Sequence, residues 1–222
     1  MLSQLQILNS YHLKILALVT MIIDHIGAIF YPHLIFLRII GRVAFVLYAF
    51  MLVEGVYHTN NIHKYIKKIF IWALLSEVPF DIAFYGTPFY FGHQNIYFTL
   101  LISILGIYYL QRIKSFFYSI IVVLVVINVS CFLNFDYSWY GTTMILAFYL
   151  LKKLNAFKYI FIQTISTIAT FNILGVQIFA FLGFIPILIY NGQQGKKIGA
   201  IYYSCYAIHL LIFALIKYLI ND

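Results

Sequence analysis

Apolar runs long enough to cross a lipid bilayer follow one another along almost the whole chain. Of its 222 residues, 64% are hydrophobic and only 9% are charged. Charged residues make up about 25% of an ordinary soluble domain, and a membrane-spanning helix needs about 20 apolar residues. The sequence therefore predicts an all-α, polytopic transmembrane helical bundle.

Spans of about 17 to 23 residues divide the chain into nine predicted helices. They cover residues 12–31, 35–57, 65–85, 94–111, 116–134, 139–152, 157–173, 174–190 and 198–219. Eight or ten spans remain open, because the sixth is short and the break between the seventh and the eighth is weak. No internal repeat or separately folding loop is recognisable, so residues 1–222 are predicted to form a single domain.

The connecting loops alternate in charge, which predicts the orientation of the chain. Every second loop carries basic residues, namely Lys64, Lys67 and Lys68; Arg112 and Lys114; Lys152, Lys153 and Lys158; and Lys196 and Lys197. The loops between them carry none, so the positive-inside rule places the N-terminus in the cytoplasm and the C-terminus outside. These small basic groups between apolar runs favour a lipid bilayer as the partner and not a nucleic acid.

Charged residues inside the predicted spans are the most informative feature for function. They are Asp24, Arg38, Arg42, Glu54, Glu77 and Asp81. A charge at bilayer depth costs about 2.5–3.5 kcal/mol on the insertion scale, so such residues are rare and usually functional. The predicted orientation puts Glu54 near the cytoplasmic end of its span and the other five in the outer half of the membrane.

Two pairs of these residues are spaced by one helical turn. Arg38 and Arg42 share one helical face, and Glu77 and Asp81 share another, so the two arginines are predicted to face the two carboxylates. An ion-pair lattice that only holds the second and third spans together is the structural alternative to substrate binding. With Asp24, the layer carries one excess negative charge, so we expect a protonated carboxyl or a protonated neighbouring histidine.

His25 is the predicted proton-transfer residue. Imidazole titrates near neutral pH, which suits a general base acting on an amine or a hydroxyl. The neighbouring Asp24 side chain diverges from it by about 100° on a helix, so Asp24 is predicted to be a charge partner.

Further polar residues inside the spans are expected to lie near this layer. His209 shares a polar stripe with Tyr206 on the last span, and Asn95 begins the fourth; interhelical hydrogen bonding is the alternative role for all three. Gln177 is predicted at the same depth, Asp136 at the outer rim, and the remaining histidines, including His93, at the membrane interface. No zinc motif is present, and the basic neighbours argue against a metal site.

Several sequence blocks carry a resemblance to a known family. They are Asp24-His25-Ile26-Gly27, Leu37-Arg38-x-Ile40-Gly41-Arg42, Ser76-Glu77-x-Pro79-Phe80-Asp81, Asn95-x-x-Phe98-Thr99, Asp136-Tyr137-Ser138-Trp139-Tyr140-Gly141 and Tyr206-x-x-His209. On these residues, nearly the whole chain resembles the TraX family of bacterial membrane proteins. That family is named for the conjugative protein that N-acetylates the pilin subunit.

The resemblance implies an acyltransferase of the bacterial cytoplasmic membrane. Acetyl-CoA or another acyl-CoA would be the donor, and an amine of an extracytoplasmic protein, peptide or lipoprotein would be the acceptor. The thioester would pass Glu54 and the loop of Lys64, Lys67 and Lys68 to reach His25; a purely topogenic role is the alternative for these lysines. The residues expected to bind the substrate or to stabilise an oxyanion are Arg38, Arg42, Glu77, Asp81, Asn95, Tyr206 and His209.

Two other functions compete with acyl transfer. A proton-coupled transporter or flippase would use the buried charges as a substrate path. A non-catalytic membrane assembly factor would use them only to hold its helices together.

Overall fold

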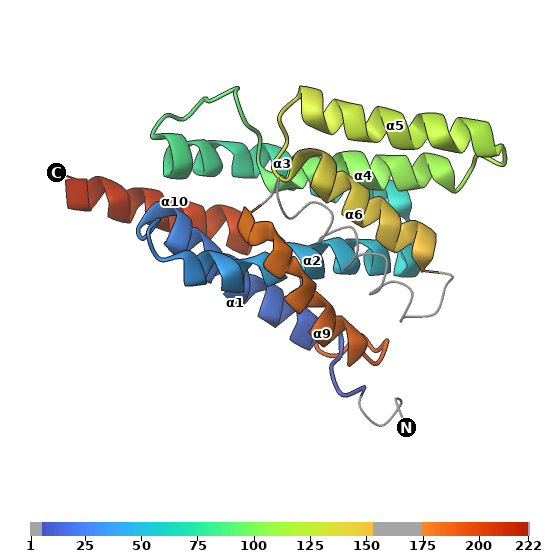
Figure 1. The fold of residues 1–222 in the computed structure, drawn as a ribbon, viewed down its shortest axis with the longest axis horizontal. Coiled ribbons are helices and arrows are strands. Elements are labelled where there is room, and N and C mark those ends of the chain that lie inside the picture. The colour runs from blue at the N-terminus through green and yellow to red at the C-terminus, as the bar shows by residue number, and fades with distance from the viewer. Residues whose placement is uncertain (1–5, 153–174, 222) are drawn as a thin grey trace. The chain divides into compact units, whose positions relative to one another are not determined.

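The computed structural model describes residues 6–152 and 175–221, and every regular element within these ranges is helical (Figure 1). The helices are α1 (Ser10–Ile29), α2 (Ile35–His58), α3 (Ile62–Tyr85), α4 (Ile96–Leu110), α5 (Phe116–Phe132), α6 (Ser138–Leu151), η2 (Gly175–Gly183), α9 (Phe184–Leu188) and α10 (Ile201–Asn221). The prediction of an all-α chain is confirmed for these residues.

The helices coincide with the predicted spans to within a few residues, except in one region. In place of a continuous span over 174–190, η2 is a 3₁₀ helix and α9 has only 5 residues. Gly183 lies at their junction and Pro186, which lacks an N–H donor, lies inside α9, so both residues weaken a regular α-helix here. The predicted span 157–173 lies outside the described residues.

Three of the described helices meet the length and hydropathy of a membrane span. They are α1, α2 and residues 201–220 of α10, while α4, α5 and the segment from Gly175 to Leu188 are apolar but shorter. The α3 helix is as long as α2 but carries more charged residues. The apolar helices are compatible with a membrane protein, whereas nine spans and their orientation stay predictions.

The chain divides into two compact units, to which α2 and α10 both contribute. Unit 1 comprises residues 1–51 and 151–205, and unit 2 comprises residues 52–150 and 206–222. In unit 1, α1 and α2 approach closely because Gly27 lies at their contact: a Cβ atom there would lie 2.8 Å from the Leu37 Cβ. The buried core of unit 1 includes Leu13, Ala17 and Leu47.

The segment before α1 is held by the segment that follows α9. The Leu8 N–H donates to the Ile189 carbonyl at 2.9 Å, and the Leu8 carbonyl accepts from the Asn191 N–H at 2.8 Å. Asn9 then caps α1, because its side chain accepts from the His12 N–H. The backbone N–H and carbonyl groups just before α1 thereby find hydrogen-bond partners within unit 1.

Unit 2 is built around α3, α4 and α5, which pack in sequence order. Gly106 of α4 allows α5 to come near, since a Cβ atom there would lie 2.8 Å from Val126 Cγ2. The loop before α4 pairs with the loop before α6: the Gln94 N–H donates to the Asn134 carbonyl at 3.1 Å, and the Asp136 N–H donates to the Gln94 carbonyl at 2.9 Å. This pairing brings together residues from distant parts of the sequence.

Candidate functional site

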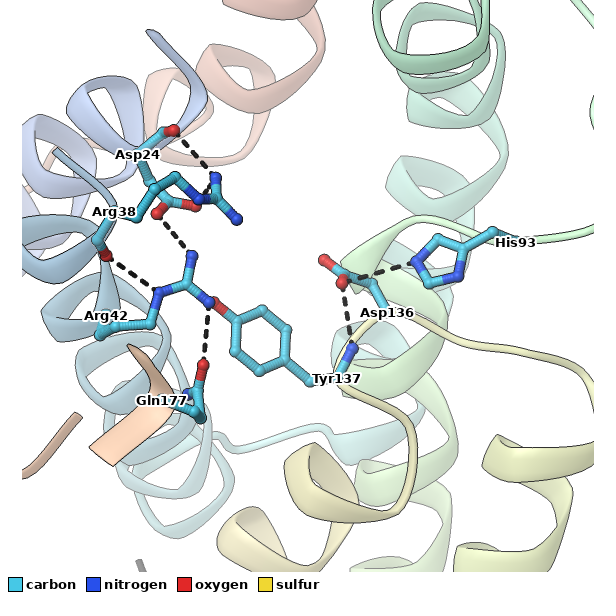
Figure 2. A network of polar contacts seen from close by, with 7 residues as sticks. All are labelled: Asp24, Arg38, Arg42, His93, Asp136, Tyr137 and Gln177. Carbon is cyan, nitrogen blue, oxygen red and sulfur yellow. Dashed lines mark hydrogen bonds and ion pairs between the residues drawn. The ribbon is translucent and has the colours of Figure 1, made fainter. Parts of the chain in front are cut away.

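Asp24 lies at the centre of a buried polar cluster in unit 1 (Figure 2). Its Oδ2 accepts a hydrogen bond from Arg38 Nη1 at 2.9 Å, and its Oδ1 accepts one from Arg42 Nη2 at 2.5 Å. Arg38 Nη1 also donates to the Asp24 backbone carbonyl at 3.0 Å. Asp24 and Arg42 are each only 7% exposed, so these charge-assisted hydrogen bonds are shielded from solvent.

The spacing of the two arginines on α2 places both beside the same carboxylate. Arg42 Nε donates to the Arg38 carbonyl at 3.1 Å, which fixes the guanidinium of Arg42 against its own helix. Arg42 Nη1 donates to Gln177 Oε1 of η2 at 2.8 Å. Gly41 permits this arrangement, because a Cβ atom there would overlap the Asp24 side chain. We call Asp24, Arg38, Arg42 and Gln177 the arginine cluster.

In unit 2, Asn95 joins the α3 helix to the start of α4. Its backbone N–H donates to Glu77 Oε2 at 3.1 Å, and its side-chain Nδ2 donates to the same oxygen and to the Ala73 carbonyl. Its Oδ1 accepts from the Tyr97 N–H at 2.9 Å and so caps α4. Asn95 is fully buried, and these contacts satisfy its amide in the way a buried polar side chain requires.

His93 and Asp136 form an ion pair in unit 2 (Figure 2). His93 Nε2 lies 3.6 Å from Asp136 Oδ1, and the imidazole stacks on Phe80 with ring centroids 5.8 Å apart. Hydrogen bonding to Asp136 raises the pKa of His93 above its ordinary value; burial opposes this shift, and the negative charges of Asp136, Glu77 and Asp81 reinforce it. The imidazole is therefore a stronger base than a free histidine.

Asp81 adds a third carboxylate to this part of unit 2. It is 2% exposed, and its Oδ2 accepts from the Tyr90 N–H at 2.8 Å. Its Oδ1 is buried and has no hydrogen-bond partner among the residues that the structure describes. We call Glu77, Asp81, His93, Asn95 and Asp136 the carboxylate cluster, which holds three carboxyl groups and one imidazole.

The backbone that presents Asp136 is strained. Asn134, Tyr137 and Ser138 have φ angles of 51°, 61° and 42°, in the left-handed region that residues other than glycine rarely adopt. The Asp136 carbonyl accepts from Thr99 Oγ1, and Asp136 Oδ1 accepts from the Tyr137 N–H at 3.0 Å. Strain of this kind accumulates at functional sites, where the surrounding structure maintains it.

Two residues predicted to belong to the site lie on the part of α10 that belongs to unit 2. Tyr206 and His209 are buried, with exposed fractions of 4% and 6%. The Tyr206 ring meets Tyr97 edge to face at 5.5 Å and His209 at 5.7 Å. Tyr97 donates its N–H to Asn95 Oδ1, so Tyr206 lies near the start of α4, where Asn95 belongs to the carboxylate cluster.

The residues predicted to meet the acyl donor lie at the junction of α2 and α3. Glu54 is buried, and its Oε2 is 3.8 Å from Nδ1 of His58. Lys64, Lys67 and Lys68 are exposed in the first turns of α3. Their role in binding an acyl donor stays a prediction.

Asp24 of α1 is the partner that the structure gives to both arginines. The close approach of α1 and α2 at Gly27 and Gly41 brings this carboxylate within reach of both guanidinium groups. That the two arginines also face the Glu77 and Asp81 carboxylates stays a prediction. His25, the predicted base, is half-buried on α1.

Two contacts were not predicted. His93 was interpreted only as interfacial and Asp136 as a rim residue, and the hydrogen bond of Gln177 was not foreseen. Asp136 opens a distinctive sequence block, and Gln177 was placed at the depth of the arginines, so the sequence contained some signal for both. Within residues 6–152 and 175–221, no group of three histidines, cysteines or acidic residues has a geometry that fits a metal ion.

Comparison with known proteins finds a matching family and related sequences. Residues 10–217 match the family described as TraX protein. A probable fimbrial assembly protein FimC, serogroup H1, of Dichelobacter nodosus is 24% identical, over 94% of this chain and 96% of its own length. An uncharacterized protein of Rickettsia prowazekii is 31% identical, over 60% of this chain and 50% of its own length. No solved structure matches.

Proposed function

Because the chain belongs to the TraX protein family, we propose that it is an integral membrane acyltransferase of the bacterial cytoplasmic membrane. It transfers an acetyl or other short acyl group from a coenzyme A thioester to an amine of an extracytoplasmic protein, peptide or lipoprotein. The family match over residues 10–217 supports this proposal, and so does the similarity to a relative named as a fimbrial assembly protein. Pilus or fimbrial subunits are the acceptors we propose first.

The observation that carries the chemistry is the His93–Asp136 pair inside the carboxylate cluster. An amine enters mostly as an ammonium ion, which the carboxyl groups of Glu77, Asp81 and Asp136 attract. It must lose a proton before it can attack a carbonyl carbon. An imidazole whose protonated form is stabilised by a carboxylate is suited to accept that proton.

The reaction then balances as an ordinary aminolysis of a thioester. The first proton moves from the ammonium group to the imidazole, and the neutral nitrogen attacks the thioester carbonyl carbon. A C–N bond forms, the C–S bond breaks, and coenzyme A leaves as a thiolate. The second proton of the attacking nitrogen reaches that thiolate, and the imidazolium returns its proton to solvent.

The donor is proposed to enter from the cytoplasmic side. The predicted topology, with nine spans and a cytoplasmic N-terminus, would put Glu54 and the exposed Lys64, Lys67 and Lys68 at that side. Lysine ammonium groups bind phosphates as point charges, which suits the nucleotide end of coenzyme A. The sequence favours His25 as the base, and the geometry adds His93 as a second candidate, so both are tested.

Acyl transfer is measured with the purified protein in vesicles loaded with isotope-labelled acetyl-CoA, with a peptide corresponding to a mature pilin N-terminus outside. Mass spectrometry is expected to detect a labelled amide that vesicles without the protein do not form. His93→Ala should lower the rate about 10²–10⁴-fold, the usual contribution of a general base. His33→Ala, which changes an exposed loop histidine, is the matched control.

The two candidate bases give different outcomes in this assay. If His25→Ala abolishes transfer while His93→Ala retains a near-normal rate, the base is His25 and the role of His93 is rejected. If the unmodified protein forms no acyl amide with any pilin-derived or lipoprotein-derived peptide, acyl transfer itself is rejected.

A non-catalytic assembly factor is the second candidate function, because the name of the Dichelobacter nodosus relative refers to assembly alone. In that case, cells lacking this protein would lose surface fibres while their subunits keep unchanged masses. An acyltransferase predicts instead a loss of one acyl mass from the subunit.

A further inference from the structure

The start of α3 and the end of α4 together form a basic end of unit 2. The two helices pack against each other, and the ring of His63 on α3 meets the ring of Tyr108 on α4 edge to face, with centroids 5.2 Å apart. Residues 59–68 and 108–115 contain no acidic residue. Their lysine and arginine residues are Lys64, Lys67, Lys68, Arg112 and Lys114. These two segments therefore attract anions to one end of unit 2.

The side chain of Arg112 is held in place by Tyr108. Its guanidinium carbon Cζ lies 3.5 Å from the centroid of the Tyr108 ring, and its Nη1 donates to the Tyr108 carbonyl at 2.8 Å. Arg112 makes no other hydrogen bond or ion pair among the residues that the structure describes. Because Arg112 is exposed, the guanidinium edge formed by Nε and Nη2 is open to a ligand.

This geometry suits a ligand with phosphate groups. Two N–H groups on one guanidinium edge match two oxygens of a phosphate, and a side chain already fixed on an aromatic ring loses less conformational entropy on binding. His63 is exposed and contacts the same phenol ring. Its ring centroid and Arg112 Cζ are thus no further apart than the sum of their distances to the Tyr108 centroid, so linked phosphates can reach both residues.

We propose that Arg112, with His63 beside it, binds the phosphate groups of coenzyme A. This inference rests on the proposed acyl transfer, whose donor carries a 5′-diphosphate and a 3′-phosphate on its adenosine. A single phosphate monoester already has a charge of about −1.5 to −2, so such a ligand requires several cations. The lysines of α3 supply some of them, and Arg112 extends the donor site to the end of α4.

Arg112→Lys separates phosphate binding from the orienting role that any basic loop has in a membrane protein. Lysine keeps the positive charge on which the positive-inside rule depends, but it is a point charge without the planar fork of a guanidinium. The variant is thus expected to insert normally and to bind coenzyme A at least tenfold more weakly. Tyr108→Leu removes the ring that holds Arg112 and should also weaken binding, whereas Tyr108→Phe keeps the ring and is the matched control.

Binding is measured by ³¹P line broadening of the diphosphate signal of free coenzyme A, with the full-length protein in phosphatidylcholine nanodiscs at constant ionic strength. We expect saturable broadening with the wild type and with Tyr108→Phe, and little with Arg112→Lys and Tyr108→Leu. Adenosine, which lacks phosphate, should not compete. Where Arg112→Lys does not fold, the contrast between the two Tyr108 variants decides.

Three outcomes overturn the proposal. They are no saturable broadening with the wild type, equal broadening with the wild type and Arg112→Lys, and full competition by adenosine. If the wild type fails to broaden the signal but immobilises spin-labelled phosphatidylglycerol more than Arg112→Lys does, the phosphates bound there are those of lipids.

The vesicle assay keeps this site distinct from the proposed reaction. Arg112→Lys should raise the KM for acetyl-CoA at least tenfold and leave kcat near the wild-type value. Amide formation with an unchanged KM would reject the Arg112 site and retain acyl transfer. Binding of coenzyme A without amide formation would reject acyl transfer and retain the site.

Discussion

The protonation state of His93 makes the stability of the carboxylate cluster depend on pH. Hydrogen bonding to Asp136 and the neighbouring negative charges raise the pKa of His93 in the folded protein. The stabilising contribution of the ion pair is therefore fully present below about pH 6.5, the pKa of an unperturbed histidine, and is lost as the pH rises through the raised value. The neutral imidazole, which is the form that can accept a proton, becomes populated as the pH rises through the same range. The rate of acyl transfer should therefore increase with pH while the stabilisation by the ion pair decreases.

This prediction is checked by NMR titration of the histidine side chains in labelled protein. Asp136→Asn removes the partner charge and should move the midpoint of His93 down toward the ordinary value, while exposed His33 stays unchanged. An unaltered His93 midpoint in Asp136→Asn would contradict the pairing at 3.6 Å between His93 Nε2 and Asp136 Oδ1.

At the scale of elements, the contact between α1 and α2 depends on Gly41. Gly41→Ala should destabilise the protein, because the new methyl group would overlap the buried Asp24 carboxylate and separate it from Arg42. Overpacking of this kind costs about 1–3 kcal/mol, which outweighs the gain of up to about 1 kcal/mol in helix propensity when glycine becomes alanine. Thermal unfolding in nanodiscs measures the net change.

Gly55→Ala in the same helix is the matched control for this substitution. A Cβ atom there would lie 2.6 Å from the Tyr65 hydroxyl oxygen, but this is the far end of a side chain that can rotate away. We expect Gly55→Ala to be close to neutral. Equal effects of the two substitutions would mean that the contact with Asp24 is not what requires glycine at position 41.

Helix positions were predictable from the sequence to a greater extent than helix contacts. Residues with a clear local role mark the helix ends, as at Asn61, which caps the start of α3, and Gly86, whose φ of 73° ends it. Hydropathy and loop charge predict the depth of a residue but not its neighbour, so they did not identify Asp24 as the partner of Arg38. His93 was missed because its partner Asp136 comes from a distant loop.

At the scale of the whole molecule, the predicted orientation can be tested on a single helix. Cys131 is exposed near the end of α5, and Lys114 is exposed just before its start. In a Cys205→Ser background, a membrane-impermeant maleimide added to intact cells should label Cys131. In a further variant with Cys131→Ser and Lys114→Cys, labelling should require permeabilised cells, because basic loops stay in the cytoplasm. The reverse pattern would invert the proposed topology and the side from which the donor enters.

The hydrogen bonds between residues 8–10 and 189–193 have a consequence for the timing of assembly. The ribosome makes residues 8–10 before residues 52–150, and residues 189–193 after them. The backbone groups ahead of α1 must therefore wait through the synthesis of the intervening helices before they find their partners in unit 1. Residues 52–150 of unit 2 have all been made by then. A nascent chain that stops before residue 189 would lack this contact. The start of α1 thus depends on a segment that is made much later, which ordinary vectorial folding does not require.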